Sequence, residues 1–243
     1  MKKNLQIYLF IFVMCGISAL ILSTVSTSLK PLQIKAEETY RNKELLKAAS
    51  LLPKIASFTQ INELTKEKLT PMLTDSLGNI FTFEQKGIDY STYLEMGAKS
   101  GYFMLPFKLF FQIKGGGIVL PVNGFGLWDA IYGYIGIDKN GFSIIGVSWY
   151  DQKETPGLGA EISSPSWGQL FIGKSLFHGK KLETFGLNFV PKEMLTLLPP
   201  DDKEYSIDAI SGATITTQGV SHAIKTSLSP YIPLLRKIQK STL

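Results

Sequence analysis

The sequence begins with an apolar segment that is long enough to cross a membrane. It runs from Ile7 to Val25, after the short basic start Met1-Lys2-Lys3. As a helix, about 19 residues with a rise of about 1.5 Å each match roughly the thickness of a bilayer core. The positive-inside rule places Lys2 and Lys3 in the cytoplasm and the rest of the chain outside. We therefore expect residues 1–29 to form a cytoplasmic tip and a transmembrane anchor.

A cleaved signal peptide is the alternative, because the small residues from Ser23 to Ser28 offer a cleavage site. The apolar stretch exceeds the usual signal-peptide core of about 7 to 15 residues, which favours the anchor. The one cysteine of the chain, Cys15, lies inside this segment. A single cysteine excludes an intramolecular disulfide and a Cys-X-X-Cys site, so redox chemistry would need a bound organic cofactor.

The rest of the chain, about 215 residues, suits one main domain. Residues 30–101 are expected to form a helical and mixed connecting region. Within it, the pattern of apolar and charged residues from Pro31 to Leu52 predicts one or two amphipathic helices. A turn at Leu77-Gly78-Asn79 and a short strand from Ile80 to Phe83 follow.

From Tyr102 onward the pattern changes to strands. Apolar runs are separated by hairpin signals at Lys114-Gly115-Gly116 and Asp138-Lys139-Asn140-Gly141. The runs are 107–113, 117–122, 130–137 and 143–150. Later segments predict a short helix at 166–173, a strand at 182–189, a polar loop around Pro199-Pro200, and helices at 216–228 and 231–240 separated by Pro230. The expected fold class is α+β, with a largely antiparallel sheet and flanking helices in residues 102–243.

The charge of the chain gives no sign of nucleic-acid binding. Its 25 Lys and Arg residues exceed its 20 Asp and Glu residues by a formal charge of +5, but the basic residues are scattered. His178 and His222 stand far apart, and no spacing of His or acidic residues is typical of a zinc or iron site. The sequence has no phosphate loop, dinucleotide fingerprint or nucleophile elbow. We therefore expect neither a metal centre nor independent catalysis.

The segment from Asp208 to Thr216 carries the most specific chemistry of the chain. It precedes a predicted helix, and a helix N-terminus offers free N–H groups and a partial positive charge to an anion. Gly212 and Ala213 let the backbone approach a phosphate closely. The hydroxyl groups that add donors are those of Ser211, Thr214, Thr216 and Thr217. The alternative is that Ser211 or Thr214 only caps a helix that begins near Thr216.

Two glycine-rich stretches lie upstream of this segment. In Gly124-Phe125-Gly126-Leu127-Trp128, the indole of Trp128 either stacks on a ring system or fills the core. In Glu154-Thr155-Pro156-Gly157-Leu158-Gly159, Pro156 fixes one backbone angle, and Gly157 and Gly159 permit left-handed conformations. The amides of this turn can therefore face a ligand, although either stretch alone is also compatible with an ordinary turn.

Together these segments resemble the C subunit of the sodium-translocating NADH:quinone oxidoreductase. The resemblance rests on Gly124 to Trp128, Tyr150 to Glu161, Trp167 with Gly173-Lys174, and Asp208 to Thr214, in the same order and at similar spacing. It covers the chain from Tyr102 to the C-terminus, and the anchor. Ala160 and Ala209 stand where the family commonly has glycine. The G subunit of the Rnf electron-transport complex shares the Glu-Thr-Pro-Gly-Leu-Gly and Ser-Gly-Ala-Thr motifs and is an alternative.

The resemblance implies an electron-relay subunit with one covalently bound FMN. In that family the FMN phosphate is joined to the threonine that closes Ser-Gly-Ala-Thr, which is Thr214 here, and a flavin transferase attaches it during maturation. The other subunits belong to a complex that oxidises NADH, reduces ubiquinone and exports sodium across the cell inner membrane. The C-terminal domain is then periplasmic.

By analogy, further cofactor-binding residues lie at the phosphate and near the ring. The phosphate residues are Ser211, Gly212 and Ala213, and those nearer the ring are Glu154, Thr155, Gly157, Leu158, Gly159, Gly126, Leu127 and Trp128. Another alternative, from a different functional class, is a membrane-anchored extracytoplasmic scaffold or ligand-binding module without a redox cofactor.

Overall fold

The computed structural model describes residues 2–100, 102–178 and 184–242, which form two compact units. The first unit ends at Arg41, and the second begins at Asn42. The first unit is the N-terminal part of helix α1 (Lys2–Ala48). Among the described residues, α1 is the one helix long and apolar enough to cross a membrane, and its most apolar stretch, with a mean hydropathy of 2.4, is not buried.

The one or two amphipathic helices expected between Pro31 and Leu52 are instead the last part of helix α1, which is continuous with the apolar segment. Pro31 lies inside α1 and lacks only the one N–H that it would have donated. The helix ends where Ser50 takes a positive φ of 58°. The N–H groups of Ser50 and Leu51 then bond back to Lys47 and Leu46, the pattern of a Schellman cap.

The second unit is built on a six-stranded antiparallel sheet with the order β2-β1-β3-β4-β5-β6. The strands are β1 (Leu69–Thr74), β2 (Ile80–Phe81), β3 (Lys108–Ile113), β4 (Ile118–Phe125), β5 (Ala130–Ile137) and β6 (Ile144–Asp151). Strands β3 to β6 match the four predicted apolar runs, and the α+β class is confirmed. Strands β1 and β2 come from residues 30–101 and join the same sheet beside β3.

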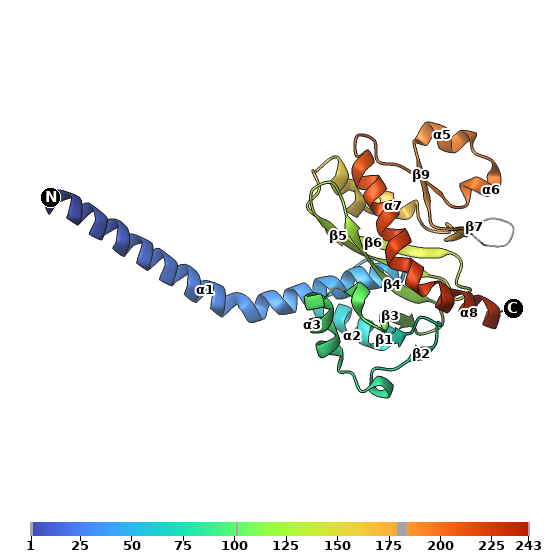
Figure 1. Cartoon of the computed structure of the whole chain (residues 1–243), viewed down its shortest axis with the longest axis horizontal. Helices are drawn as coiled ribbons and strands as arrows, with labels where there is room; N and C mark the ends of the chain where they lie inside the picture. Colours follow the sequence, from blue (N-terminus) through green and yellow to red (C-terminus); the bar gives the residue numbers. More distant parts are fainter. Residues whose placement is uncertain (1, 101, 179–183, 243) are drawn as a thin grey trace. The chain divides into compact units, whose positions relative to one another are not determined.

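Helices cover both faces of this sheet (Figure 1). Their bounds are α2 (Phe58–Lys68), α3 (Tyr90–Ser100), α4 (Pro165–Gln169), α5 (Lys192–Leu197), α6 (Pro200–Lys203), α7 (Thr214–Leu228) and α8 (Ile232–Thr242). The core follows the alternation of the strands: in β4, Leu120 packs with α7 and α8, whereas Val119 packs with α2, α3 and the end of α1. The sheet is therefore the middle of three layers.

Some connecting segments differ from the sequence prediction. The polar loop expected around Pro199-Pro200 contains the short helices α5 and α6, and these prolines occupy the start of α6, where a missing N–H costs little. The helix expected over 166–173 ends at Gln169. Of the strand expected over 182–189, residues 182 and 183 lie outside the described residues. The described part contains β8 (Thr184–Phe185), which pairs with β7 (Phe177–His178), and β9 (Asn188–Val190), which pairs with β10 (Ser206–Asp208).

The last turns of α1 lie against a pair of glycines in the sheet. Gly136 of β5 and Gly146 of β6 are cross-strand partners. A Cβ atom on Gly146 would lie 2.6 Å from the carbonyl oxygen of Ala48, so glycine lets helix and sheet backbones touch. Nearby, the buried carboxylate of Glu44 accepts a hydrogen bond from Ser148. These contacts fix residues 42–48 on the sheet.

Candidate functional site

Three segments that are distant in the sequence meet at one end of the sheet. They are the tip of the β4–β5 hairpin (residues 126–129, the hairpin tip), the loop that follows β6 (residues 152–159, the Glu154 loop), and the first turn of α7 (residues 214–217). Helix α7 lies across β4 (Figure 1), where Ser227 bonds to Asn123 and the backbones of Gly219 and Phe125 touch. The structure therefore brings together the segments that carry the predicted site residues.

The first turn of α7 separates the four candidate hydroxyl groups. Thr216 and Thr217 are buried, with exposed fractions of 1% and 2%. The Thr216 hydroxyl donates to Glu154, and the Thr217 hydroxyl donates to the carbonyl oxygen of Ala213 at 2.9 Å. Thr214 and Ser211 are exposed, and neither hydroxyl has a hydrogen-bond partner in the described part of the chain. They are the two hydroxyls of this segment available to a ligand.

The alternative that Ser211 or Thr214 caps the helix is wrong. Helix α7 begins at Thr214, two residues earlier than predicted, and its N-cap is Ala213, with no side-chain cap hydrogen bond. Gly212 turns the chain into the helix with φ of +74°. Helix geometry leaves the N–H groups of Thr214, Ile215 and Thr216 without intrahelical partners, whereas the N–H of Thr217 donates to Ala213, and the macrodipole makes this end partly positive. The Thr214 hydroxyl stands at this end.

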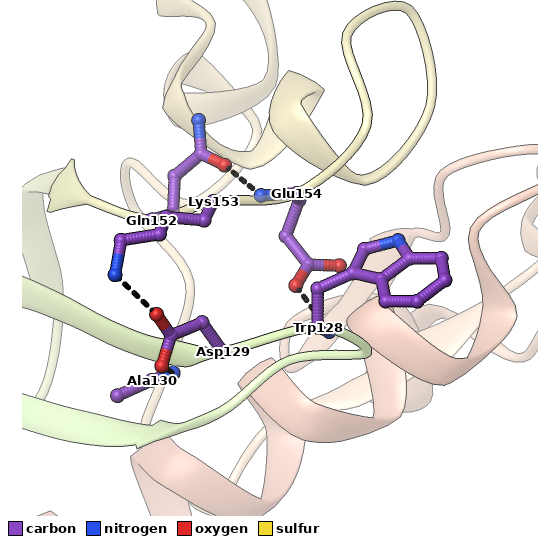
Figure 2. A network of polar contacts seen from close by, with 6 residues as sticks. All are labelled: Trp128, Asp129, Ala130, Gln152, Lys153 and Glu154. Atoms are coloured by element: carbon purple, nitrogen blue, oxygen red, sulfur yellow. Dashed lines mark hydrogen bonds and ion pairs between the residues drawn. The ribbon is translucent and has the colours of Figure 1, made fainter. Parts of the chain in front are cut away.

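The carboxylate of Glu154 joins the three segments, and 5% of the residue is exposed. Oε1 accepts the backbone N–H of Trp128 at 2.9 Å, as Figure 2 shows, and Oε2 accepts the Thr216 hydroxyl at 2.5 Å. Desolvation raises the pKa of this carboxyl, but the hydrogen bonds from Thr216 and from the N–H groups of the hairpin tip outweigh it, so the pKa lies below its ordinary value. Glu154 is therefore a buried anion satisfied by protein donors.

The glycines of the two loops have different roles. Gly157 takes the predicted left-handed conformation, with φ of +74°. Gly159 does not, which corrects that expectation. A Cβ atom on Gly159 would lie 2.6 Å from Thr216 Oγ1 and 2.7 Å from Glu154 Oε2, and one on Gly126 would collide with the same carboxylate. These two glycines make room for Glu154.

Exposed apolar side chains lie on the hairpin tip and on the Glu154 loop. Trp128 is 69% exposed, so the core-filling alternative for this residue is wrong. Its indole N–H donates to the Thr155 hydroxyl at 3.2 Å, which ties the hairpin tip to the Glu154 loop a second time. Leu127 and Leu158 are also exposed. Large exposed apolar groups gathered on one surface are typical of a binding site.

The sequence interpretation did not include two further exposed apolar residues in or next to these segments. Phe125 and Ile215 are exposed by 74% and 56%. Phe125 directly precedes the predicted Gly126, and Ile215 directly follows the predicted Thr214. This adjacency is the sequence signal that could have identified Ile215. The Asp129 carboxylate of the hairpin tip accepts from the N–H of Ala130 at 2.7 Å and pairs with Lys153 at 2.5 Å, and both contacts lower the pKa of this carboxyl (Figure 2).

Trp167 supports the strand that leads into this site. It is buried, and its indole N–H donates to the carbonyl oxygen of Asp208 at 2.9 Å. Asp208 ends β10, from which the chain enters the turn before α7. His222 is exposed on α7 and His178 stacks on Tyr205, so the structure does not bring the two histidines into one cluster. Within the described residues, no group of His, Cys, Asp or Glu is arranged to hold a metal ion.

Comparisons with known proteins point to one family. The family described as FMN-binding domain matches residues 126–229, which include all three segments. A protein of Chlamydia muridarum, named as the C subunit of a Na(+)-translocating NADH-quinone reductase, is 32% identical, over 94% of this chain and 91% of its own. The protein of the same name from Chlamydia caviae is 29% identical, over 99% and 94%. The crystal structure of such a protein from Parabacteroides distasonis superposes with a TM-score of 0.68 at 25% identity, covering 85% of this chain and 96% of that one.

Proposed function

Because the chain belongs to the family of the C subunits of Na(+)-translocating NADH-quinone reductases, we propose that it relays electrons through one FMN bound covalently, through its phosphate, to Thr214. Its partners are then the other subunits of a membrane complex that oxidises NADH, reduces ubiquinone and exports sodium. The chain itself has no independent activity in this proposal.

The observation that carries the proposal is the state of the Thr214 hydroxyl. It is exposed and lacks a hydrogen-bond partner among the described residues, whereas the hydroxyls of Thr216 and Thr217 are buried and bonded. A hydroxyl that accepts a phosphoryl group must be accessible to the enzyme that modifies it. The N–H groups of Thr214, Ile215 and Thr216, which have no intrahelical partners, stabilise the negative charge of the resulting phosphodiester.

The residues around Thr214 suit the rest of the cofactor. Gly212 has no side chain, so a phosphate can approach the backbone just before the helix. The exposed hydroxyl of Ser211 is a second hydrogen-bond donor. The exposed apolar groups of Leu127, Trp128 and Leu158 provide a surface for an aromatic ring system. When bound, FMN supplies the electron-transfer chemistry, which none of the side chains of the site performs.

Attachment requires a flavin transferase that uses FAD. The oxygen of the Thr214 hydroxyl forms the new bond to the phosphorus of the FMN half, the pyrophosphate bond breaks, AMP leaves, and the hydroxyl proton goes to the transferase. The product is a phosphothreonine ester, which keeps the flavin on the protein. Thr214 is thus an attachment residue without a role in turnover.

We further propose that α1 anchors the chain in the cell inner membrane. Its apolar N-terminal part is long enough for one crossing. Lys2 and Lys3 favour a cytoplasmic N-terminus. The second unit, with Thr214, then lies on the periplasmic side, where a covalent bond prevents the loss of the cofactor.

The test is a denaturing gel of the full chain, produced in a host with a flavin transferase and viewed under ultraviolet light. We expect a fluorescent band for the wild type and none for Thr214→Val, which keeps the shape of the side chain and removes the hydroxyl. Thr226→Val is the matched control, because Thr226 is also an exposed threonine of α7, outside the site.

A dark wild-type band would favour the scaffold alternative, in which no cofactor is bound. Fluorescence that persists in Thr214→Val would place the bond elsewhere. The intact mass of the wild type should rise by one FMN less one water.

A further inference from the structure

The Glu154 carboxylate bonds to two other segments of the protein. One carboxylate oxygen is held by the backbone of the hairpin tip, the other by Thr216 in the first turn of α7. Its own N–H donates to the side chain of Gln152 at 2.6 Å (Figure 2). Both oxygens are thus occupied by protein donors, and in the described part of the chain no other side chain joins these two segments by hydrogen bonds.

Two glycines make the room that this carboxylate occupies. Glycine at 126 and 159 allows it to lie between the hairpin tip and α7, because a Cβ atom at either position would overlap it. Gly212 comes just before α7, and a Cβ atom on it would lie 3.0 Å from Leu158 in the Glu154 loop. The Glu154 loop therefore contacts the chain both before and after Thr214.

Removing the carboxylate would leave several donors unsatisfied. The partly buried N–H of Trp128 and the buried hydroxyl of Thr216 would lose their acceptor, and the Thr216 side chain would be free to turn. Thr216 and Thr214 belong to the same first turn of α7. A shift of that turn displaces the hydroxyl of Thr214, which no other described side chain holds.

We propose that Glu154 is a positioning residue: its carboxylate fixes the first turn of α7 to the hairpin tip and so presents the Thr214 hydroxyl for phosphoryl transfer. The inference rests on the proposed function for its consequence, but its structural part concerns the protein before any flavin is attached. In this role Glu154 acts through the first turn of α7, because both of its carboxylate oxygens accept from protein donors.

A glutamine variant separates the hydrogen bonds of Glu154 from its negative charge. In Glu154→Gln, the amide oxygen still accepts from the hairpin tip, and the amide N–H donates to the Thr216 oxygen, which accepts as well as donates. Both connections persist without the charge. In Glu154→Ala, neither persists.

The experiment measures how fast each full-length protein, purified without flavin, gains covalent flavin from a flavin transferase and FAD. We expect Glu154→Ala to load at least about tenfold more slowly than the wild type, since small misplacements of a reacting group have large effects on rate. Glu154→Gln should load nearly as fast as the wild type. Ile224→Ala, a core change on the same helix away from the site, is the control for a general loss of thermal stability.

Equal rates for Glu154→Ala and the wild type would overturn the inference. So would slow loading of Ile224→Ala at an equal loss of thermal stability, or a glutamine variant as slow as alanine. If the wild type gains no flavin at all, the proposed function fails, and hydrogen exchange of the flavin-free proteins then decides. Faster amide exchange in residues 126–129 and 214–217 of Glu154→Ala than of Glu154→Gln supports the positioning role, and equal exchange contradicts it.

Discussion

The contact between α1 and the sheet predicts that Gly146→Ala destabilises the second unit. A Cβ atom there would lie 2.6 Å from the Ala48 oxygen, 2.8 Å from the Lys47 oxygen and 3.1 Å from the Ala48 carbonyl carbon. All three are backbone atoms, so no rotamer change relieves the overlap. The last turn of α1 must move away from β6.

The magnitude follows from what this movement disturbs. Leu46 and Ala48 belong to the last turn of α1 and are fully buried, and Leu45 beside them is 3% exposed. Overpacking a core costs about 1–3 kcal/mol, and a clash with fixed backbone belongs at the upper end, about 3 kcal/mol. For a domain of about 150–250 residues, this lowers Tm by about 6–12 °C.

Tryptophan fluorescence during heating is the suitable assay, because the three tryptophans, 128, 149 and 167, all lie in the second unit. Gly168→Ala is the control: its Cβ atom would meet Val147 at an ordinary 3.6 Å, and alanine favours the helix in which it lies. The control should match or exceed wild-type Tm. A Tm of Gly146→Ala within about 2 °C of the wild type, a change of less than about 1 kcal/mol, would refute the predicted backbone clash.

Two further predictions concern Glu154. Thr216→Val removes the hydroxyl that donates to Oε2 of Glu154. The free energy of unfolding, measured by chemical denaturation, should fall by about 2 kcal/mol, as for other hydrogen bonds to charged groups. Any covalent flavin should stay on Thr214, and an unchanged free energy of unfolding would contradict the prediction. Because the folded-state pKa of Glu154 lies below 4.5, its ionised form stabilises the fold above that pH, and this contribution is lost as the pH falls through the lowered value. Tm measured from pH 6 down to pH 3 should therefore fall less steeply for Glu154→Gln than for the wild type, and parallel curves would be the contrary result.

Strands β3 to β6 could be predicted because each is a continuous apolar run, and turns with glycine separate β3 from β4 and β5 from β6. Strand β1 could not, since Pro71 interrupts its pattern. Pro71 is tolerated because β2 pairs only with Leu73 and Thr74, which leaves the edge of β1 beside Pro71 without a partner strand among the described residues. Proline is tolerated here because the neighbouring strand, β2, is too short to reach Pro71. The local sequence of β1 does not contain the length of β2.

At the site, residue types indicated the segments but not the role of each residue. The position of Gly159 against Thr216 depends on a contact between distant segments, so a left-handed turn was the only reason for glycine visible in the sequence. The start of α7 at Thr214 was missed because Ala213, its N-cap, has no capping side chain. The exposure of Trp128 follows from its place on the hairpin tip, beyond the edge of the core.

The order of the site residues along the chain has a consequence for the sequence of events during synthesis. The hairpin tip and the Glu154 loop leave the ribosome before α7, and until α7 arrives the Glu154 carboxylate lacks Thr216 and the adjoining face of β4 is uncovered. Thr214 acquires its surroundings only when the last helices have packed. Under the proposed function, flavin loading is then a late event in the life of each molecule, and a fluorescent chain is one in which the C-terminal helices have reached their places.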